Sequence, residues 1–183
     1  DTGLKGKRAL VTGGGTGIGR AIALELAREG VHIAVASRDP DQKTIAEIES
    51  FGVKALRLCI DVSKEDQVIN MVKQAIEGLG GLDLYVNNVA GHWDEPVTKI
   101  TTYGWLNSLH TNLSACVWAC REVAKHFILQ GSGSILIIGS VCFYTSLPKE
   151  VSYRVSKTGL RAYMGTLSAE LAPFKIRVNM VTP

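Results

Sequence analysis

Short apolar runs alternate with longer amphipathic segments along the whole chain. The apolar runs predict buried strands at residues 8–12, 31–36, 53–60, 82–86, 134–138 and 176–181. Between them, apolar residues recur at helical spacing and predict helices at 17–29, 41–51, 64–79, 103–130 and 151–171. Strands that are apolar on both faces are typical of a parallel sheet covered by helices on both sides. The pattern therefore predicts an α/β fold with a single doubly wound parallel sheet.

Length and composition narrow the class of protein. The chain has 183 residues, of which 46% are hydrophobic, so we expect one folded domain and exclude disorder. Its formal net charge of +3 is too small an excess to suggest nucleic-acid binding. No apolar run is long enough to span a membrane, and the polar start at residues 1–8 is unlike a signal peptide. The four cysteines form no metal-ligand spacing, and they favour free thiols in a reducing cytoplasm.

A glycine-rich turn joins the first predicted strand to the first predicted helix. Glycines let the backbone turn tightly and approach a pyrophosphate, and the helix N-terminus offers free N–H groups to phosphates. The placement between strand and helix makes this a dinucleotide-binding signal rather than a bare glycine pattern. The expected contacts are Gly13, Gly15, Thr16, Gly17, Ile18 and Gly19.

The spacing Gly-x-x-x-Gly-x-Gly, counted from Gly13, resembles that of the short-chain dehydrogenase/reductase family. The resemblance covers essentially the whole chain. It implies a Rossmann-type fold, with one dinucleotide-binding and catalytic domain over residues 1–183. Because the strand at 176–181 would be an open apolar edge, we expect the domain to be C-terminally truncated. The family's last strand and C-terminal lid would then be missing.

The end of the second predicted strand bears on the choice of cofactor. Ser37 stands where the family's NAD-binding members usually carry Asp, and Arg38 follows it. A hydroxyl and a guanidinium suit a ribose 2′-phosphate, whereas an acid would repel it. Asp39 is the competing acid, but Asp39-Pro40-Asp41 is more typical of a turn and a helix cap. We therefore expect NADP(H), with NAD(H) as the alternative.

The resemblance implies further cofactor contacts. They include Asp61 at the adenine, with Val62 beside it, and Pro183, which matches the start of a cofactor-contacting Pro-Gly. The family's Asn-Asn-Ala-Gly segment corresponds to Asn87-Asn88-Val89-Ala90-Gly91, in which Val89 is an extra residue. Small residues here let the cofactor ribose pass, so the implied contacts on this segment are Asn88, Ala90 and Gly91.

A Tyr-x-x-x-Lys pair lies on the predicted helix at 151–171. Tyr153 and Lys157 share one helix face because they are four residues apart. A tyrosine with the reference pKa of about 10 is a poor acid–base catalyst at neutral pH, and a nearby ammonium favours the phenolate. The pair can therefore exchange a proton with a carbonyl oxygen. Lys157 can also hydrogen-bond the nicotinamide ribose, which adds both residues to the expected cofactor contacts.

The resemblance completes the catalytic set with Ser140 and Asn112. Ser140 follows the strand at 134–138, in register with the family's catalytic serine, and would orient the substrate oxygen. Asn112 lies within the helix at 103–130, in the setting where the family's asparagine interrupts the helix and holds a water linked to the lysine. The candidate catalytic residues are thus Asn112, Ser140, Tyr153 and Lys157.

These expectations define an oxidoreductase that transfers a hydride between NADP(H) and a ketone or secondary alcohol. A 3-oxoacyl thioester is one substrate class among several small molecules. The alternatives are an NAD-dependent alcohol dehydrogenase and a dinucleotide-binding protein without turnover. The family commonly pairs the helices at 103–130 and 151–171 with those of a second subunit, so the resemblance implies a homo-oligomer, either a dimer or a tetramer.

Overall fold

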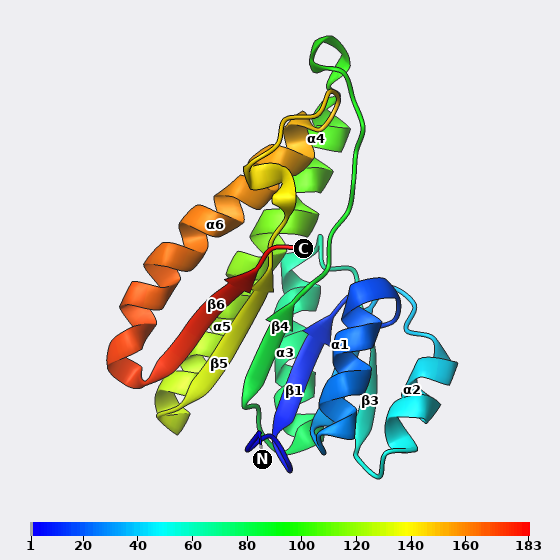
Figure 1. Ribbon diagram of the computed structural model, residues 1–183, viewed down its shortest axis with the longest axis vertical. Coiled ribbons are helices and arrows are strands. Elements are labelled where there is room, and N and C mark those ends of the chain that lie inside the picture. Colours follow the sequence, from blue (N-terminus) through cyan, green and yellow to red (C-terminus); the bar gives the residue numbers. More distant parts are fainter. Residues whose placement is uncertain (1) are drawn as a thin grey trace.

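The computed structural model describes residues 2–183 as one six-stranded, wholly parallel sheet with helices on both faces (Figure 1). The strand order is β3-β2-β1-β4-β5-β6. This order confirms the predicted doubly wound α/β fold. The strands are β1 (Arg8–Thr12), β2 (His32–Ser37), β3 (Ala55–Cys59), β4 (Leu84–Asn87), β5 (Gly133–Ile138) and β6 (Ile176–Val181).

The helices follow the predicted amphipathic segments closely, with one exception. The segment predicted as a single helix at 103–130 is divided into α4, a π-helical turn at His110–Ser114, and α5. The helices are α1 (Gly17–Arg28), α2 (Gln42–Glu49), α3 (Glu65–Leu79), α4 (Thr102–Leu109), α5 (Ala115–Gln130) and α6 (Val151–Leu171). Among residues 2–183, no helix is both long and apolar enough to cross a membrane.

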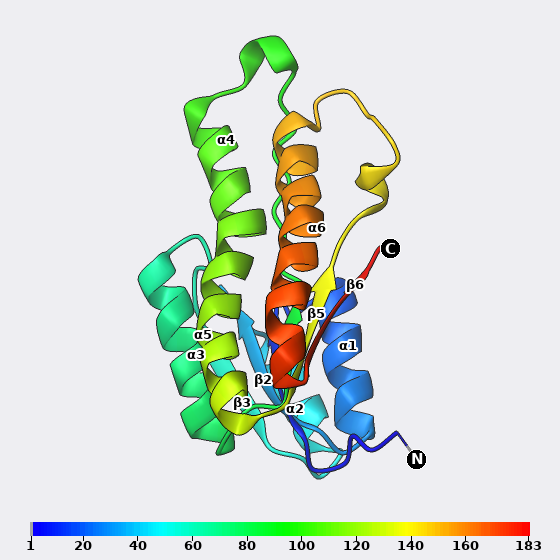
Figure 2. The same ribbon diagram turned by 90° about the vertical axis from the view of Figure 1, so that its left-hand side faces the viewer.

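Two hydrophobic cores lie on opposite faces of the sheet. Successive strand residues point to opposite faces, so Leu10 of β1 joins one core while Ala9 and Val11 join the other. Helices α1 and α2 cover one face over β1, β2 and β3, whereas α3, α5 and α6 cover the other (Figures 1 and 2). This two-sided burial is the physical reason for the apolar strands.

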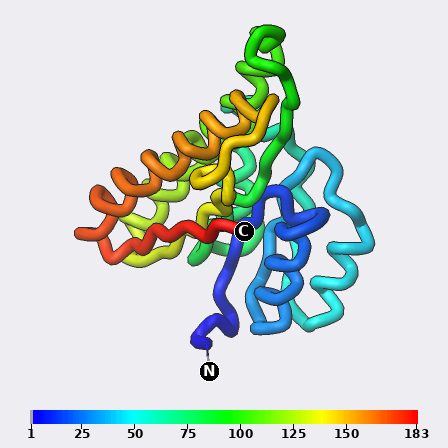
Figure 3. Tube along the Cα trace, turned by 45° about the horizontal axis from the view of Figure 1, so that its top comes forward, coloured from blue at the N-terminus to red at the C-terminus, as the bar shows by residue number. Residues whose placement is uncertain are grey.

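The carboxyl ends of the strands meet along one edge of the sheet. The chain leaves β1 toward β2 but returns on the other side with β4, so the strand order reverses between β1 and β4. Ligands of open α/β sheets bind at such a reversal. After β4 the chain rises well above this edge before α4 begins, and the C-terminus follows β6 back to it (Figures 1 and 3).

Candidate active site

A cleft of about 730 Å³ lies at the carboxyl ends of β1, β2, β3 and β4. It runs from the glycine-rich turn to the segment that follows β4 and to helix α4. The cleft is lined by most of the predicted cofactor contacts, namely Gly13, Thr16, Gly17, Ile18, Ser37, Arg38, Asp61, Val62, Asn88, Ala90 and Gly91.

Five predicted cofactor contacts do not line this cleft. Gly15 and Gly19 lie within the glycine-rich turn and pack against its neighbours rather than facing the opening. Tyr153 and Lys157 lie on α6, beyond the end of the cleft. Pro183 follows β6, where its carbonyl accepts a hydrogen bond from the backbone N–H of Val141 at 3.2 Å.

The glycine-rich turn has the backbone that a close approach to a ligand requires. Gly13 and Gly17 have φ values of 65° and 52°, which L-residues rarely adopt. A Cβ at Gly19 would collide with the carbonyl of Gly13, so only glycine lets the turn pass this close to α1. Thr16 caps α1 without a side-chain hydrogen bond, which leaves the first amides of the helix directed to the cleft mouth. This end of the helix suits a phosphate.

The end of β2 presents a hydroxyl and a guanidinium to the cleft. The Oγ atom of Ser37 is buried and has no hydrogen-bond partner within residues 2–183. Arg38 beside it is exposed and lines the cleft. Asp39 instead pairs with Arg57 of β3 at 2.9 Å, and Asp41 caps α2 by accepting the backbone N–H of Lys43 in the first turn of the helix. The carboxylate of Asp39 is therefore engaged outside the cleft. An anionic group bound in the cleft would accept a hydrogen bond from the unpartnered hydroxyl of Ser37.

Asp61 also lines the cleft and brings a negative charge near Arg38. Burial alone would raise the pKa of Asp61, but hydrogen bonds from Ser63 and the nearby charges of Lys64 and Arg38 hold it below the ordinary value. Its Oδ1 accepts the backbone N–H of Ser63 at 3.0 Å. The carboxylate is thus ionised at neutral pH and fixed at the turn after β3.

Asn88 connects β4 to the glycine-rich turn. Its side-chain amide donates to the carbonyls of Thr12 at 3.1 Å and Gly13 at 3.3 Å, while its backbone N–H donates to Thr12 Oγ1 at 3.0 Å. Asn88 therefore holds the turn in place as well as lining the cleft. The extra residue, Val89, packs its side chain against the core beneath α3 and α5.

Asn112 lies at the centre of the π-helical turn and joins three parts of the site. Its Oδ1 accepts the N–H of Gly91 at 2.7 Å, and its Nδ2 donates to the carbonyl of Gly91 at 2.9 Å and to Ser156 Oγ at 3.1 Å. Ser156 in turn donates to the carbonyl of Tyr153 at 2.7 Å. The interrupted helix expected at Asn112 is confirmed, and the side chain couples the segment after β4 to α6.

Lys157 is buried behind Tyr153. Its Nζ donates to the carbonyl of Ile138 at 2.9 Å and lies 6.0 Å from the centroid of the Tyr153 ring. Burial lowers the pKa of the Lys157 ammonium below its ordinary value, and the thiols of Cys116 and Cys142 offset only part of that shift.

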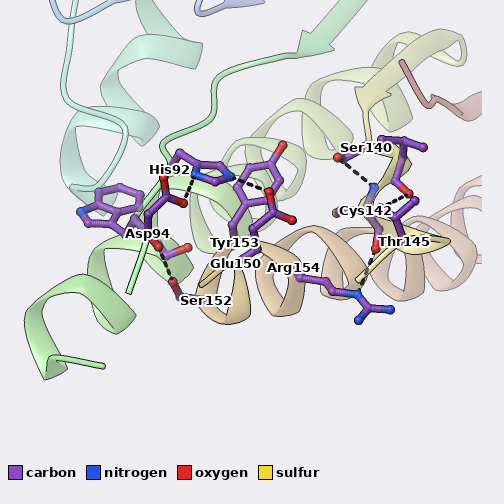
Figure 4. Close-up of polar contacts among 12 residues, drawn as sticks. His92, Asp94, Ser140, Cys142, Thr145, Glu150, Ser152, Tyr153 and Arg154 are labelled. Carbon is purple, nitrogen blue, oxygen red and sulfur yellow. Dashed lines mark hydrogen bonds and ion pairs between the residues drawn. The ribbon is translucent and has the colours of Figure 1, made fainter. Parts of the chain in front are cut away.

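Ser140 lies at the end of β5, on the loop that Figure 4 draws across from Tyr153. Its Oγ accepts the backbone N–H of Cys142 at 3.2 Å. Because the oxygen accepts from an amide, the hydroxyl hydrogen is directed elsewhere and can donate to a substrate oxygen. Ser140 and Tyr153 thus approach one region from two different elements.

His92 and Glu150 contact the site but were not among the residues predicted for it. The imidazole of His92 packs on the ring of Tyr153 with centroids 4.3 Å apart, and it also contacts Glu150. His92 lines the cleft, so this contact places Tyr153 at the border of the cleft. The one sequence signal was the position of His92, directly after the segment Asn87–Gly91 at a strand end.

The comparisons with known proteins agree with this geometry. The family model described as short chain dehydrogenase matches residues 7–183. The chain is 33% identical over 180 residues to a 3-oxoacyl-acyl-carrier-protein reductase of Staphylococcus epidermidis, covering 97% of this chain and 74% of that protein. It is 36% identical over 183 residues to dehydrogenase/reductase SDR family member 4 of Sus scrofa, covering 98% of this chain and 66% of that protein.

Solved structures show the same relationship. An NAD⁺-bound xylitol dehydrogenase superposes with a TM-score of 0.94 at 31% identity, covering 100% of this chain and 71% of that chain. A metagenomic short-chain oxidoreductase in complex with NADP gives a TM-score of 0.94 at 29% identity, covering 98% and 83%. The protein belongs to the short-chain dehydrogenase/reductase family of oxidoreductases. It spans only part of the length of these relatives.

Proposed function

We propose that this protein transfers a hydride between NADP(H) and a ketone or secondary alcohol, with Tyr153 as the general acid and base. The single observation that carries the proposal is the arrangement of Lys157 and Tyr153. A buried ammonium lies 6.0 Å from the ring of a tyrosine that borders the cleft, and Ser140 faces the same region. The family membership shown above supports the same reaction class.

The end of β2 supports the choice of NADP(H) over NAD(H). Ser37 offers a buried hydroxyl without a partner, and Arg38 offers a guanidinium at the same wall. A 2′-phosphate on the adenosine ribose would accept from both groups. The acid that would repel this phosphate, Asp39, is engaged by Arg57. The NADP complex of a related oxidoreductase is consistent with this choice. The NAD⁺ complex of xylitol dehydrogenase supports the alternative cofactor, NAD(H).

We assign the binding and proton-transfer steps to residues of this chain. When bound, the nicotinamide supplies or accepts the hydride. The N-terminus of α1 would hold the pyrophosphate, while Lys157 would hold the nicotinamide ribose and place a positive charge near the Tyr153 ring. Ser140 donates to the substrate oxygen, and Tyr153 gives that oxygen a proton in reduction or removes it in oxidation. Asn112 fixes the segment after β4 and the helix that carries Tyr153.

A small carbonyl compound is the substrate class that these groups fit. Both Ser140 and Tyr153 act on one oxygen, so the reacting group is a ketone or the corresponding secondary alcohol. A 3-oxoacyl thioester is one candidate, supported by the similarity to the 3-oxoacyl reductase of Staphylococcus epidermidis. We also propose that the active species is a homo-oligomer, dimeric or tetrameric, with α5 and α6 at the subunit contact.

The test combines cofactor titration with turnover. Purified protein is titrated with NADPH and NADH by nicotinamide fluorescence, and a panel of ketones is then screened for NADPH oxidation. Tyr153→Phe should abolish turnover and leave NADPH affinity nearly unchanged, whereas Tyr144→Phe, which removes a hydroxyl from an exposed ring, should leave both unchanged. Large residual turnover in Tyr153→Phe would overturn the proton-transfer role. Binding of NADPH without oxidation of it by any ketone would favour a binding protein without turnover.

A further inference from the structure

The segment after β4 is fastened to the beginning of α6. The backbone N–H of Glu95 donates to the carbonyl of Lys149 at 3.1 Å, and Ser152 Oγ donates to the carbonyl of Trp93 at 3.4 Å. These two links set residues 92–95 against the first turn of the helix that carries Tyr153. The segment is thereby part of the support of the catalytic helix as well as a wall of the cleft.

His92 occupies the centre of this junction. Its Nδ1 lies 2.7 Å from Asp94 Oδ1, and its Nε2 lies 3.5 Å from Glu150 Oε1 (Figure 4). The Glu150 side chain is only 17% exposed, whereas that of Asp94 is 63% exposed. The imidazole thus has a carboxylate at each nitrogen, and the more buried of the two belongs to Glu150, the residue that caps the N-terminus of α6. These two contacts hold the imidazole between the segment after β4 and the N-terminal end of α6.

The imidazole is in turn a support for the ring of Tyr153. Their centroids are 4.3 Å apart and their planes are inclined by 47°, which is a close aromatic contact. Tyr153 itself is partly exposed at the border of the cleft, and the contact with His92 confines its ring on that side. A phenol that must reach a substrate oxygen has to be held to within a fraction of an ångström.

The backbone beside Glu150 is strained. Lys149 has a φ of 72°, one of two positive values among the non-glycine residues described. Its side chain is exposed, so packing of that side chain does not explain the conformation. The strained residue directs its carbonyl to Glu95 and places Glu150 opposite His92. Strain of this kind persists where the surrounding contacts impose it, often beside a functional group.

We propose that His92, held by Glu150 and Asp94, is a positioning residue for Tyr153. It fixes the phenol ring in the orientation needed for proton transfer and does not touch the reacting atoms itself. The inference rests on the proposed function, because it assigns a means of control to the same catalytic tyrosine. His92 and Asp94 follow β4, whereas Glu150 and Tyr153 lie at the start of α6, so the four residues come together only through folding.

Three variants separate ring packing from the carboxylate contacts. His92→Ala removes both, His92→Phe keeps an aromatic ring against Tyr153, and Glu150→Gln keeps the shape of the side chain but removes its charge. The matched control is His32→Ala, because the imidazole of His32 lies at the amino end of β2, away from the cleft, where it accepts the backbone N–H of Lys54. The measurements are kcat and KM for a ketone, the NADPH dissociation constant and the melting temperature of each variant.

The expected result is a loss of kcat without a loss of binding. His92→Ala should lower kcat by about tenfold, Glu150→Gln by about threefold, and His92→Phe should restore part of the loss seen in His92→Ala. KM, NADPH affinity and melting temperature should stay near the wild-type values. Unchanged kcat in both His92 variants, or a parallel fall of kcat, affinity and melting temperature, would overturn the positioning role.

A second measurement does not depend on turnover. Because the two rings are in contact, the imidazole C–H resonances of His92 should shift in the NMR spectrum when Tyr153→Leu removes the ring current. Resonances that stay in place would overturn the inference. If the shift occurs but the wild-type protein reduces no ketone, the contact stands and the proposed function fails, so the two failures are distinguishable.

Discussion

The ammonium of Lys157 donates to the main-chain carbonyl of Ile138 at 2.9 Å, which ties the middle of α6 to the end of β5. Lys157 is only 2% exposed, and none of the ion pairs within residues 2–183 involves it. A buried charge without a counter-ion destabilises a fold. The burial of Lys157 therefore fits the proposed role beside Tyr153 better than a contribution to stability.

We expect Lys157→Met to stabilise the protein and to abolish turnover. Methionine fills a similar volume without a buried charge, so the free energy of unfolding should rise by about 1 kcal/mol at neutral pH. Because burial lowers the pKa of Lys157 in the folded state, the wild type gains stability as pH rises through that value toward the ordinary 10.5. The difference between variant and wild type should thus shrink at high pH. Urea unfolding across pH measures this, and a less stable variant would contradict it.

Arg38→Ala should change cofactor preference rather than cofactor binding in general. Loss of a charge-assisted hydrogen bond to a phosphate should weaken NADPH by about tenfold or more, with little effect on NADH. Arg28→Ala is the matched control, because Arg28 lies at the far end of α1 and pairs with Glu25. Fluorescence titration with both cofactors provides the measurement. An equal loss of affinity for both would show that Arg38 does not contact a 2′-phosphate.

The strands could be predicted from the sequence because the central ones are apolar on both faces and the edge strand β6 alternates buried Ile176 and Val178 with exposed polar residues. Residues 8–12 and 176–181 agree with β1 and β6 residue for residue. The π-helical turn could not be placed from hydrophobic spacing, which predicts one continuous helix over 103–130. The turn depends on the side chain of Asn112, whose partners Gly91 and Ser156 lie 21 and 44 residues away. Only the resemblance to a family indicated an interruption there.

The site was predictable to the extent that its residues follow strand ends. The glycine-rich turn, Ser37 and Asp61 lie at or just after the carboxyl ends of strands, so a parallel sheet brings them to one edge. The contact between His92 and Tyr153 has no such signal, because it depends on how the segment after β4 folds back onto α6. The diversion of Asp39 to Arg57 likewise requires the pairing of β2 with β3 to be known in detail.

Asp83 should make stability depend on pH in the acid range. Burial alone would raise the pKa of Asp83, but the Arg8 guanidinium and backbone N–H hold it below the ordinary value. Its Oδ2 accepts from Arg8 Nε at 2.7 Å and from the Arg8 N–H at 2.9 Å. A carboxyl with a lowered folded-state pKa stabilises the protein above its unfolded pKa, and this contribution is lost as pH falls through the folded value.

The variant Asp83→Asn tests that expectation. At neutral pH it should lower the free energy of unfolding by about 1–2 kcal/mol, because a charge-assisted pair is replaced by a neutral one. The difference from wild type should vanish at a pH well below the reference Asp pKa of about 3.9, where both side chains are neutral. Urea unfolding at several pH values gives the comparison. A difference that stays constant with pH would mean that packing, not charge, accounts for it.

Two glycine-to-alanine substitutions should have opposite effects on stability. A methyl group at Gly19 would collide with the carbonyl of Gly13 and with the side-chain amide of Asn88, so the glycine-rich turn would have to move. Gly19→Ala should therefore lower the free energy of unfolding by about 1–3 kcal/mol and weaken NADPH binding. A Cβ at Gly165 in α6 meets nothing within 4 Å. Gly165→Ala should therefore raise the free energy of unfolding by about 0.5–1 kcal/mol and leave NADPH affinity unchanged. Chemical unfolding and NADPH titration of both variants test these expectations. If Gly19→Ala bound NADPH normally, the close approach of Gly19 to Gly13 would not be needed for cofactor binding.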